Sequence, residues 1–87
     1  MIDLDGPTPL YQQIAEVIAG RIADGTYVRG RRIPPARELA EEFGVSRRTV
    51  ADALALLQER GLLVGVRGRG TFVAPEMPKG PQPEPGA

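Results

Sequence analysis

The sequence contains no cysteine and no histidine, and these two absences exclude several kinds of function. Without cysteine the chain can form no disulfide, no thiolate metal site and no thiol nucleophile. Without histidine it lacks the commonest general base and the commonest neutral metal ligand. The sequence also has no apolar run near the roughly 18 residues of a membrane span, and it shows no secretory signal peptide. We therefore expect a cytoplasmic protein that is not an enzyme, uses no cofactor or metal, and has no membrane partner.

The charge is balanced overall but unevenly distributed along the 87 residues, a length that suits one small domain. Between Val28 and Val73, nine arginines stand against five acidic residues, which leaves +4, whereas the two flanks together carry −4. Ten of the eleven cations are arginine, the side chain best suited to bidentate contacts with phosphate and guanine. This distribution favours an anionic partner for the middle segment, although solvated surface arginines would give the same count.

The spacing of apolar residues predicts a first helix that follows Thr8-Pro9. We expect Thr8 to cap this helix and Pro9 to take its first position. Asp24-Gly25 is expected to end it, because glycine is common just past the end of a helix. One face of the helix is apolar and consists of Leu10, Ile14, Val17, Ile18 and Ile22.

Two further helices are expected close together. One runs from about Pro35 to Phe43 and stops at Gly44. After Val45 in the turn, Ser46 is expected to cap the other, which runs to about Arg60. Its buried stripe is predicted to be Val50, Ala53, Leu54 and Leu57, with Arg48, Asp52, Ala55 and Glu59 on the opposite face.

The C-terminal part of the domain has a different pattern. Leu62-Leu63-Val64 and Thr71-Phe72-Val73 are short β-prone runs, and the segment between them is basic and rich in glycine. This pattern predicts an antiparallel hairpin, and a short extended piece is expected between the first two helices, at Tyr27-Val28 and Arg32-Ile33. We therefore expect an α+β domain over residues 1–74, followed at 75–87 by a Pro/Gly-rich tail that is either disordered or a truncated linker.

The pair of helices joined by Gly44-Val45 has the shape of a helix-turn-helix. The second helix of the pair opens with a Ser cap and two arginines. Its N-terminus carries a positive dipole and free N–H groups that attract phosphate, and its first-turn side chains can reach base edges in the major groove. With the basic hairpin behind it, the order of elements is that of a winged helix, in which the hairpin is the wing.

These elements together resemble the N-terminal DNA-binding domain of the GntR family of bacterial transcription regulators, over about residues 8–74. The opening Pro-Leu-Tyr-Gln is closer to the HutC and YtrA branches than to the FadR branch. The matching segments are Pro9–Ile14, Ile22–Gly25, Arg32-Ile33-Pro34, Arg37–Ala40, Phe43–Arg47, Ala53-Leu54, Gly61-Leu62 and Gly68–Val73.

The resemblance implies a winged helix-turn-helix that binds palindromic double-stranded operators as a homodimer on DNA. The helix at about 46–60 would lie in the major groove and the wing tip at 67–69 in the minor groove. The DNA-contacting residues it implies are Arg37, Ser46, Arg47, Arg48, Thr49, Arg67, Gly68 and Arg69. The family's effector-binding domain is expected to be absent from this chain.

The sequence departs from the family pattern at positions that bear on DNA contact. Pro35 replaces the usual serine cap, and Ala36 replaces a residue that is commonly acidic. Ala51 stands where an arginine is usual, which removes one expected contact. Arg48 stands where the family often has threonine, so a different base preference is expected.

Other interpretations remain open from the sequence. Arg37 could instead form an ion pair with Glu41, one helical turn later. The whole fold could serve a protein–protein contact. The loop at 65–70 could hold a nucleotide phosphate in an enzyme, but it lacks the strand-to-helix context of such loops, and no cluster of catalytic residues accompanies it.

Overall fold

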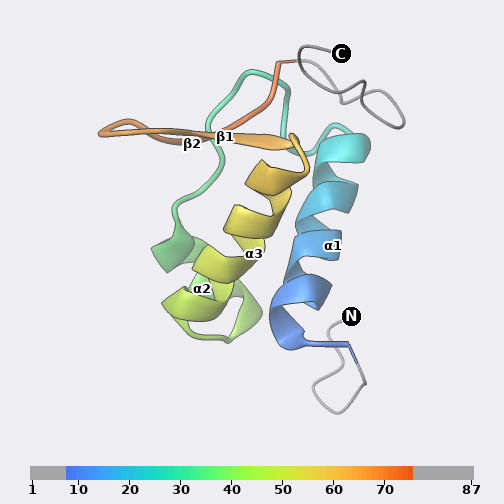
Figure 1. Ribbon diagram of the computed structural model, residues 1–87, viewed down its shortest axis with the longest axis vertical. Helices are drawn as coiled ribbons and strands as arrows, with labels where there is room; N and C mark the ends of the chain where they lie inside the picture. Colours follow the sequence, from blue (N-terminus) through green and yellow to red (C-terminus); the bar gives the residue numbers. More distant parts are fainter. Residues whose placement is uncertain (1–7, 76–87) are drawn as a thin grey trace, which may run out of the picture.

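A computed structural model of the chain describes residues 8–75 and shows three helices followed by a two-stranded antiparallel sheet (Figure 1). α1 packs along α3, α2 crosses beside α3, and the strands lie over the C-terminal end of α3 (Figure 1). This architecture is the predicted α+β winged helix-turn-helix. Residues 1–7 of the predicted domain, and the predicted tail beyond Pro75, lie outside the described residues. The elements are α1 (Leu10–Ala23), α2 (Ala36–Phe43), α3 (Arg47–Glu59), β1 (Leu63–Val66) and β2 (Gly70–Val73).

The start of α1 differs from the prediction. Pro9 is extended, with φ −54° and ψ 144°, so the helix begins only at Leu10 and no side chain caps it. The predicted Thr8 cap is wrong because Pro9 itself occupies the capping position. The predicted end is right: Asp24 follows the last helical residue, and Gly25 has a φ of +86°.

The two helices of the helix-turn-helix follow the sequence pattern closely. α2 begins after the extended Pro35 and ends at Gly44, whose φ of +68° is the left-handed conformation that glycine adopts without strain. Ser46 caps α3 as predicted, because its Oγ accepts a hydrogen bond from the Thr49 amide at 3.0 Å.

The core lies between the apolar stripes of α1 and α3 and is closed by α2 and the sheet. The predicted stripe of α3 is buried, and no polar or charged residue within residues 8–75 is buried with it. None of the helices in this part of the chain is long and apolar enough to cross a bilayer. The largest fully buried side chains are Ile14, Ile18, Leu39, Val50, Leu57 and Val73.

The turn at the wing tip is shorter than the segment that separates the two predicted β-prone runs. Leu63 pairs with Val73 and Val66 pairs with Gly70, so Gly65 and Val66 belong to the ladder and only residues 67–69 form the turn. The expected extended piece between α1 and α2 runs along the free edge of β2. There Gly30 N–H donates to the carbonyl of Val73, and Ile33 N–H donates to that of Thr71, each at 2.9 Å. The wing base is therefore tied to the α1–α2 connection.

Candidate nucleic-acid interface

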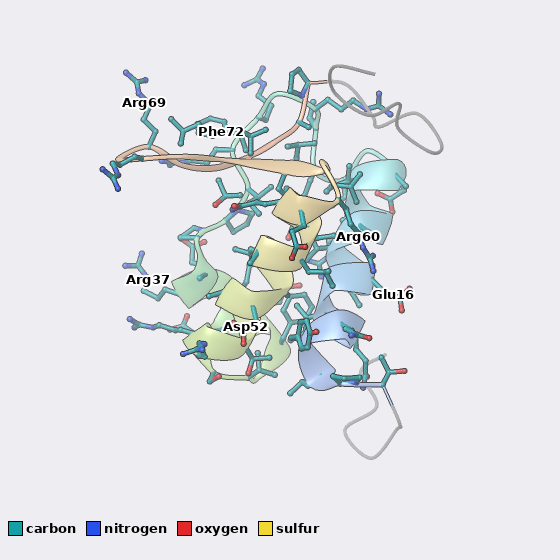
Figure 2. All side chains as sticks on the ribbon, in the orientation of Figure 1. Glu16, Arg37, Asp52, Arg60, Arg69 and Phe72 are labelled. Atoms are coloured by element: carbon teal, nitrogen blue, oxygen red, sulfur yellow. The ribbon has the colours of Figure 1, made fainter. Side chains whose placement is uncertain are left out.

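Two of the predicted contact residues project from one side of the molecule. Arg37, at the start of α2, and Arg69, at the wing tip, extend away from α1, whereas Glu16 and Arg60 lie toward the α1 side (Figure 2). A hollow of about 300 Å³ lies between the start of α2 and the wing base, and Arg32, Arg37 and Thr71 contribute to its lining. The side of the molecule that carries the wing tip and the start of α2 is thus rich in arginine.

The first turn of α3 presents the arginines that the sequence singled out. Arg47 and Arg48 are both exposed. Arg48 donates through Nε to Oδ1 of Asp52 at 3.3 Å, and its terminal nitrogens have no acceptor within residues 8–75. A guanidinium held in this way can still offer two parallel donors to a base edge. The positive end of the α3 dipole lies at the same place and favours a phosphate nearby.

Ser46 and Thr49 are hydrogen-bonded to each other. Besides the capping bond from the Thr49 amide, the two hydroxyl oxygens lie 2.8 Å apart and share a hydrogen bond. This pair fixes the first turn of α3 and hence the direction in which Arg47 and Arg48 leave the helix. A hydroxyl has two acceptor lone pairs as well as its donor, so further polar contacts by both residues remain open.

Arg37 does not form the ion pair considered from helical spacing. Its guanidinium lies 4.0 Å from the carboxylate of Glu38 rather than against Glu41, and 63% of its side chain is exposed. An exposed contact at that distance contributes little to stability. The Arg37 head group is therefore available to an outside partner.

The wing tip presents two exposed arginines on a tight turn. The turn is closed by a hydrogen bond from Arg69 N–H to the carbonyl of Val66 at 2.9 Å, and Gly68 has a φ of +79°. The side chains of Arg67 and Arg69 have no ion-pair partner in the part of the chain that the structure describes. The wing tip, Arg37 and the first turn of α3 together carry all the predicted contact residues. The structure places each of them at an exposed or partly exposed position.

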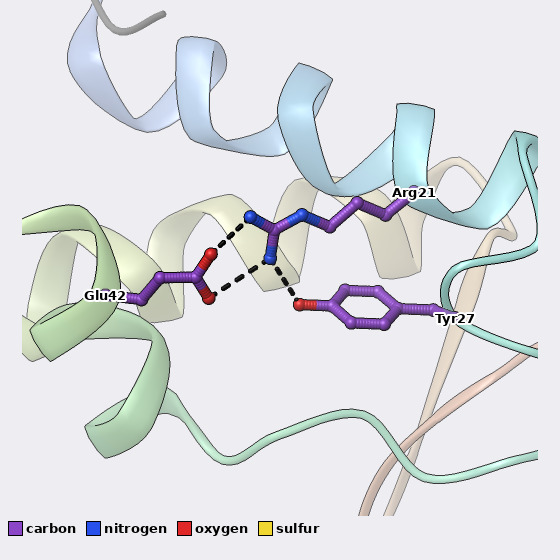
Figure 3. A network of polar contacts seen from close by, with 3 residues as sticks. All are labelled: Arg21, Tyr27 and Glu42. Carbon is purple, nitrogen blue, oxygen red and sulfur yellow. Dashed lines mark hydrogen bonds and ion pairs between the residues drawn. The ribbon is translucent and has the colours of Figure 1, made fainter.

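A polar network that sequence reasoning missed fixes α2 against α1. Arg21 of α1 donates to both carboxylate oxygens of Glu42 on α2 and, at 2.7 Å, to the hydroxyl of Tyr27 (Figure 3). Its guanidinium carbon also lies 5.5 Å from the centre of the Tyr27 ring and 5.2 Å from that of Phe43. The hydrogen bond from Arg21 lowers the pKa of Glu42, and the same bond raises that of Arg21. No local spacing links residues 21 positions apart, so this network could not be predicted from the sequence.

Comparisons with known proteins agree with this geometry. The family model described as bacterial regulatory proteins, gntR family, matches residues 10–73. The HTH-type transcriptional repressor NagR of Bacillus subtilis is 44% identical over 73 residues, which are 84% of this chain and 30% of the relative. The chain thus spans about 30% of the length of that curated relative.

Solved structures show the same fold. YtrA from Sulfolobus acidocaldarius, a GntR-family transcription factor, superposes with a TM-score of 0.79 and 40% identity, over 88% of this chain and 81% of the other. The DNA-binding domain of AraR in complex with operator ORX1 superposes with a TM-score of 0.77 and 39% identity, over 85% and 95% of the two chains.

Proposed function

Because this chain belongs to the gntR family of bacterial regulatory proteins and is a DNA-binding domain of a transcription regulator, we propose that it binds a palindromic operator through α3 and the wing. The observation that carries this proposal is the exposed, Ser-capped first turn of α3, with two arginines beside a basic wing tip. Its relatives are transcription regulators and not enzymes. A bacterial regulator acts where the chromosome lies, so its location is the cytoplasm.

The two parts of the interface perform different tasks. Arg47 and Arg48 enter the major groove, where the donor and acceptor pattern distinguishes all base pairs. Arg67, Gly68 and Arg69 enter the minor groove, whose pattern is nearly degenerate. Arg37 contacts a phosphate, and the hydroxyls of Ser46 and Thr49 accept or donate at the neighbouring backbone.

Two copies of the domain occupy the two halves of the operator. A palindromic site presents the same surface twice, and two domains related by its dyad bind it with equal contacts. A domain end near residue 74 is supported by the burial of Val73 and Ala74, and the Pro/Gly-rich composition of 75–87 supports a linker or tail there. NagR is named a repressor, and an occupied operator that excludes RNA polymerase would repress transcription here as well.

The experiment that tests this function is selection of bound duplexes from genomic DNA with the 87-residue chain. We expect an inverted repeat with a fixed spacing between its half-sites. Titration of the selected duplex in an analytical ultracentrifuge is expected to give two chains per site. Binding that does not prefer the selected duplex over a scrambled duplex of equal length would contradict the proposal, and a protein–protein role for the fold would then be favoured.

A further inference from the structure

Arg32 occupies an unusual place between the helix-turn-helix and the wing. It lies in the connection from α1 to α2, yet its backbone forms a bridge with Phe72 of β2. The hydrogen bonds on either side of it, from Val73 N–H to the carbonyl of Arg31 and from Ile33 N–H to that of Thr71, are both 2.9 Å long. The backbone of Arg32 is therefore fixed against the wing base by the ladder and not by its own side chain.

The side chain of Arg32 then runs toward the wing tip. Its Nη1 donates to the backbone carbonyl of Arg69 at 3.2 Å, 37 positions later in the chain. Its aliphatic stem covers Gly70, where an added Cβ would lie 2.9 Å from Cδ and 3.4 Å from Cγ. Gly70 also has a φ of +119°, a conformation that a side chain disfavours. The stem and the head of Arg32 thus hold the point at which β2 leaves the turn.

The tip has few other contacts that could fix its direction. The sheet has two strands and four pairs, and such a ribbon is marginally stable without further packing. The Arg69 side chain is exposed and has no ion-pair partner in residues 8–75, so its direction depends on the backbone that carries it. A tip that is already ordered loses less conformational entropy when it enters a groove.

We propose that Arg32 is a positioning residue for the wing, which sets the direction of Arg69 before DNA is bound. This inference rests on the proposed function, because the positioned group acts only on DNA. Arg29 gives a matched comparison: it is an exposed arginine in the same connection, with no side-chain hydrogen bond or ion pair among the described residues. The competing explanation is that Arg32 adds only positive charge, as Arg29 does.

The first test concerns the protein without DNA. The Arg69 amide is bonded to the carbonyl of Val66 across the turn, so its hydrogen exchange reports whether the turn is closed. In Arg32→Ala we expect this amide to exchange about fivefold faster than in the parent chain, as the loss of one hydrogen bond implies. In Arg29→Ala its exchange is unchanged. Equal exchange in Arg32→Ala and Arg29→Ala would overturn the proposal.

The second test is a double-mutant cycle on the selected operator with Arg32→Ala and Arg69→Ala. If Arg32 acts through Arg69, its replacement weakens binding about tenfold in the parent chain and only about twofold once the Arg69 side chain is gone. Replacement of Arg29 weakens binding by the same small factor in both backgrounds. Equal losses for Arg32→Ala in both backgrounds would show an independent charge effect and would overturn the proposal.

Two controls separate unfolding of the domain from loss of the Arg32 donor, and failure of DNA binding from failure of the role proposed for Arg32. Where Arg32→Ala lowers the melting temperature so far that the domain unfolds, Arg32→Met keeps the stem over Gly70 and removes only the donor. We expect the same faster exchange and the same dependence on Arg69 from Arg32→Met. Failure of the parent chain to bind any selected duplex would refute the proposed function, whereas the exchange experiment judges the role of Arg32 without DNA.

Discussion

Arg48 and Asp52 face each other across one turn of α3, with Nε of the arginine donating to Oδ1 of the aspartate at 3.3 Å. The Arg48 side chain is 85% exposed, so this ion pair contributes at most about 0.5 kcal/mol to folding. Its consequence is geometric: Asp52 engages the inner nitrogen and leaves the outer edge of the guanidinium for a base.

Replacement of Arg48 with alanine is expected to relax base preference. On the selected operator the change should cost about 1–3 kcal/mol, because two donors to one base are lost, and on a scrambled duplex it should cost far less. Fluorescence anisotropy with both duplexes measures the difference. Asp52→Ala is the companion variant: it keeps the donors but frees the head group, so preference at the same base position falls by less. An equal loss on both duplexes for Arg48→Ala would contradict the assignment to the major groove.

Replacement of Arg69 with alanine is expected to weaken binding to all sequences more evenly. The minor groove offers little base information, so the loss is mainly that of one charge near phosphates. A salt series should show the slope of log K against log salt reduced by about one unit. Arg67→Ala serves as the neighbouring comparison at the same tip. A changed base preference with an unchanged slope would argue against minor-groove entry.

The Arg21–Glu42 pair is expected to make stability depend on pH. The hydrogen bond from Arg21 lowers the pKa of Glu42 below its ordinary 4.5 in the folded chain. The stabilisation is therefore fully present above pH 4.5 and is lost as the pH falls through the lower folded value. Glu42→Gln should destabilise the domain by about 1 kcal/mol at neutral pH, because the pair is partly exposed.

Chemical denaturation at a series of pH values measures this contribution. The difference between the parent chain and Glu42→Gln should stay constant at neutral pH and shrink below pH 4.5. Glu41 is an exposed neighbour with no side-chain hydrogen bond or ion pair among the described residues, so Glu41→Gln is the matched control and should show no such difference. A difference that grew toward acidic pH would contradict the role given to Arg21.

Replacement of Ser46 with alanine is expected to affect both folding and binding. It removes the acceptor for the Thr49 amide, and the loss of such a cap typically costs about 1 kcal/mol of stability. Thermal unfolding should show a melting temperature lower by several degrees for a domain of this size. Because the cap also orders the first turn of α3, affinity for the selected operator should fall while Glu41→Gln leaves it unchanged. Unaltered melting would mean that another group satisfies the Thr49 amide.

Much of the fold could be predicted because its signals are local. The structure confirms the Ser46 cap, the buried apolar stripe of α3 and the glycine at position 44 that ends α2. Each of these signals depends on residues that lie close together in the sequence. The start of α1 was predicted wrongly, because Thr8 followed by Pro9 is a typical helix start and only the extended ψ of Pro9 shows that the helix begins at Leu10.

The long-range contacts that position the candidate interface could not be predicted from the sequence. Arg21 meets Glu42 across 21 positions, and Arg32 meets Arg69 across 37, so each depends on how the elements pack. The arginines of α3 and the wing were identified because they follow a cap and flank a glycine turn. Their roles on DNA remain predictions.

The pairing of residues 30–33 with β2 also bears on which part of the fold is least stable. The helices enclose the buried apolar core, whereas the wing beyond this edge is a two-stranded ribbon, and such a ribbon is marginally stable without further packing. The wing is therefore expected to open first on heating, while the three helices are still packed. A regulator built in this way would release the minor groove at a lower temperature than the major groove.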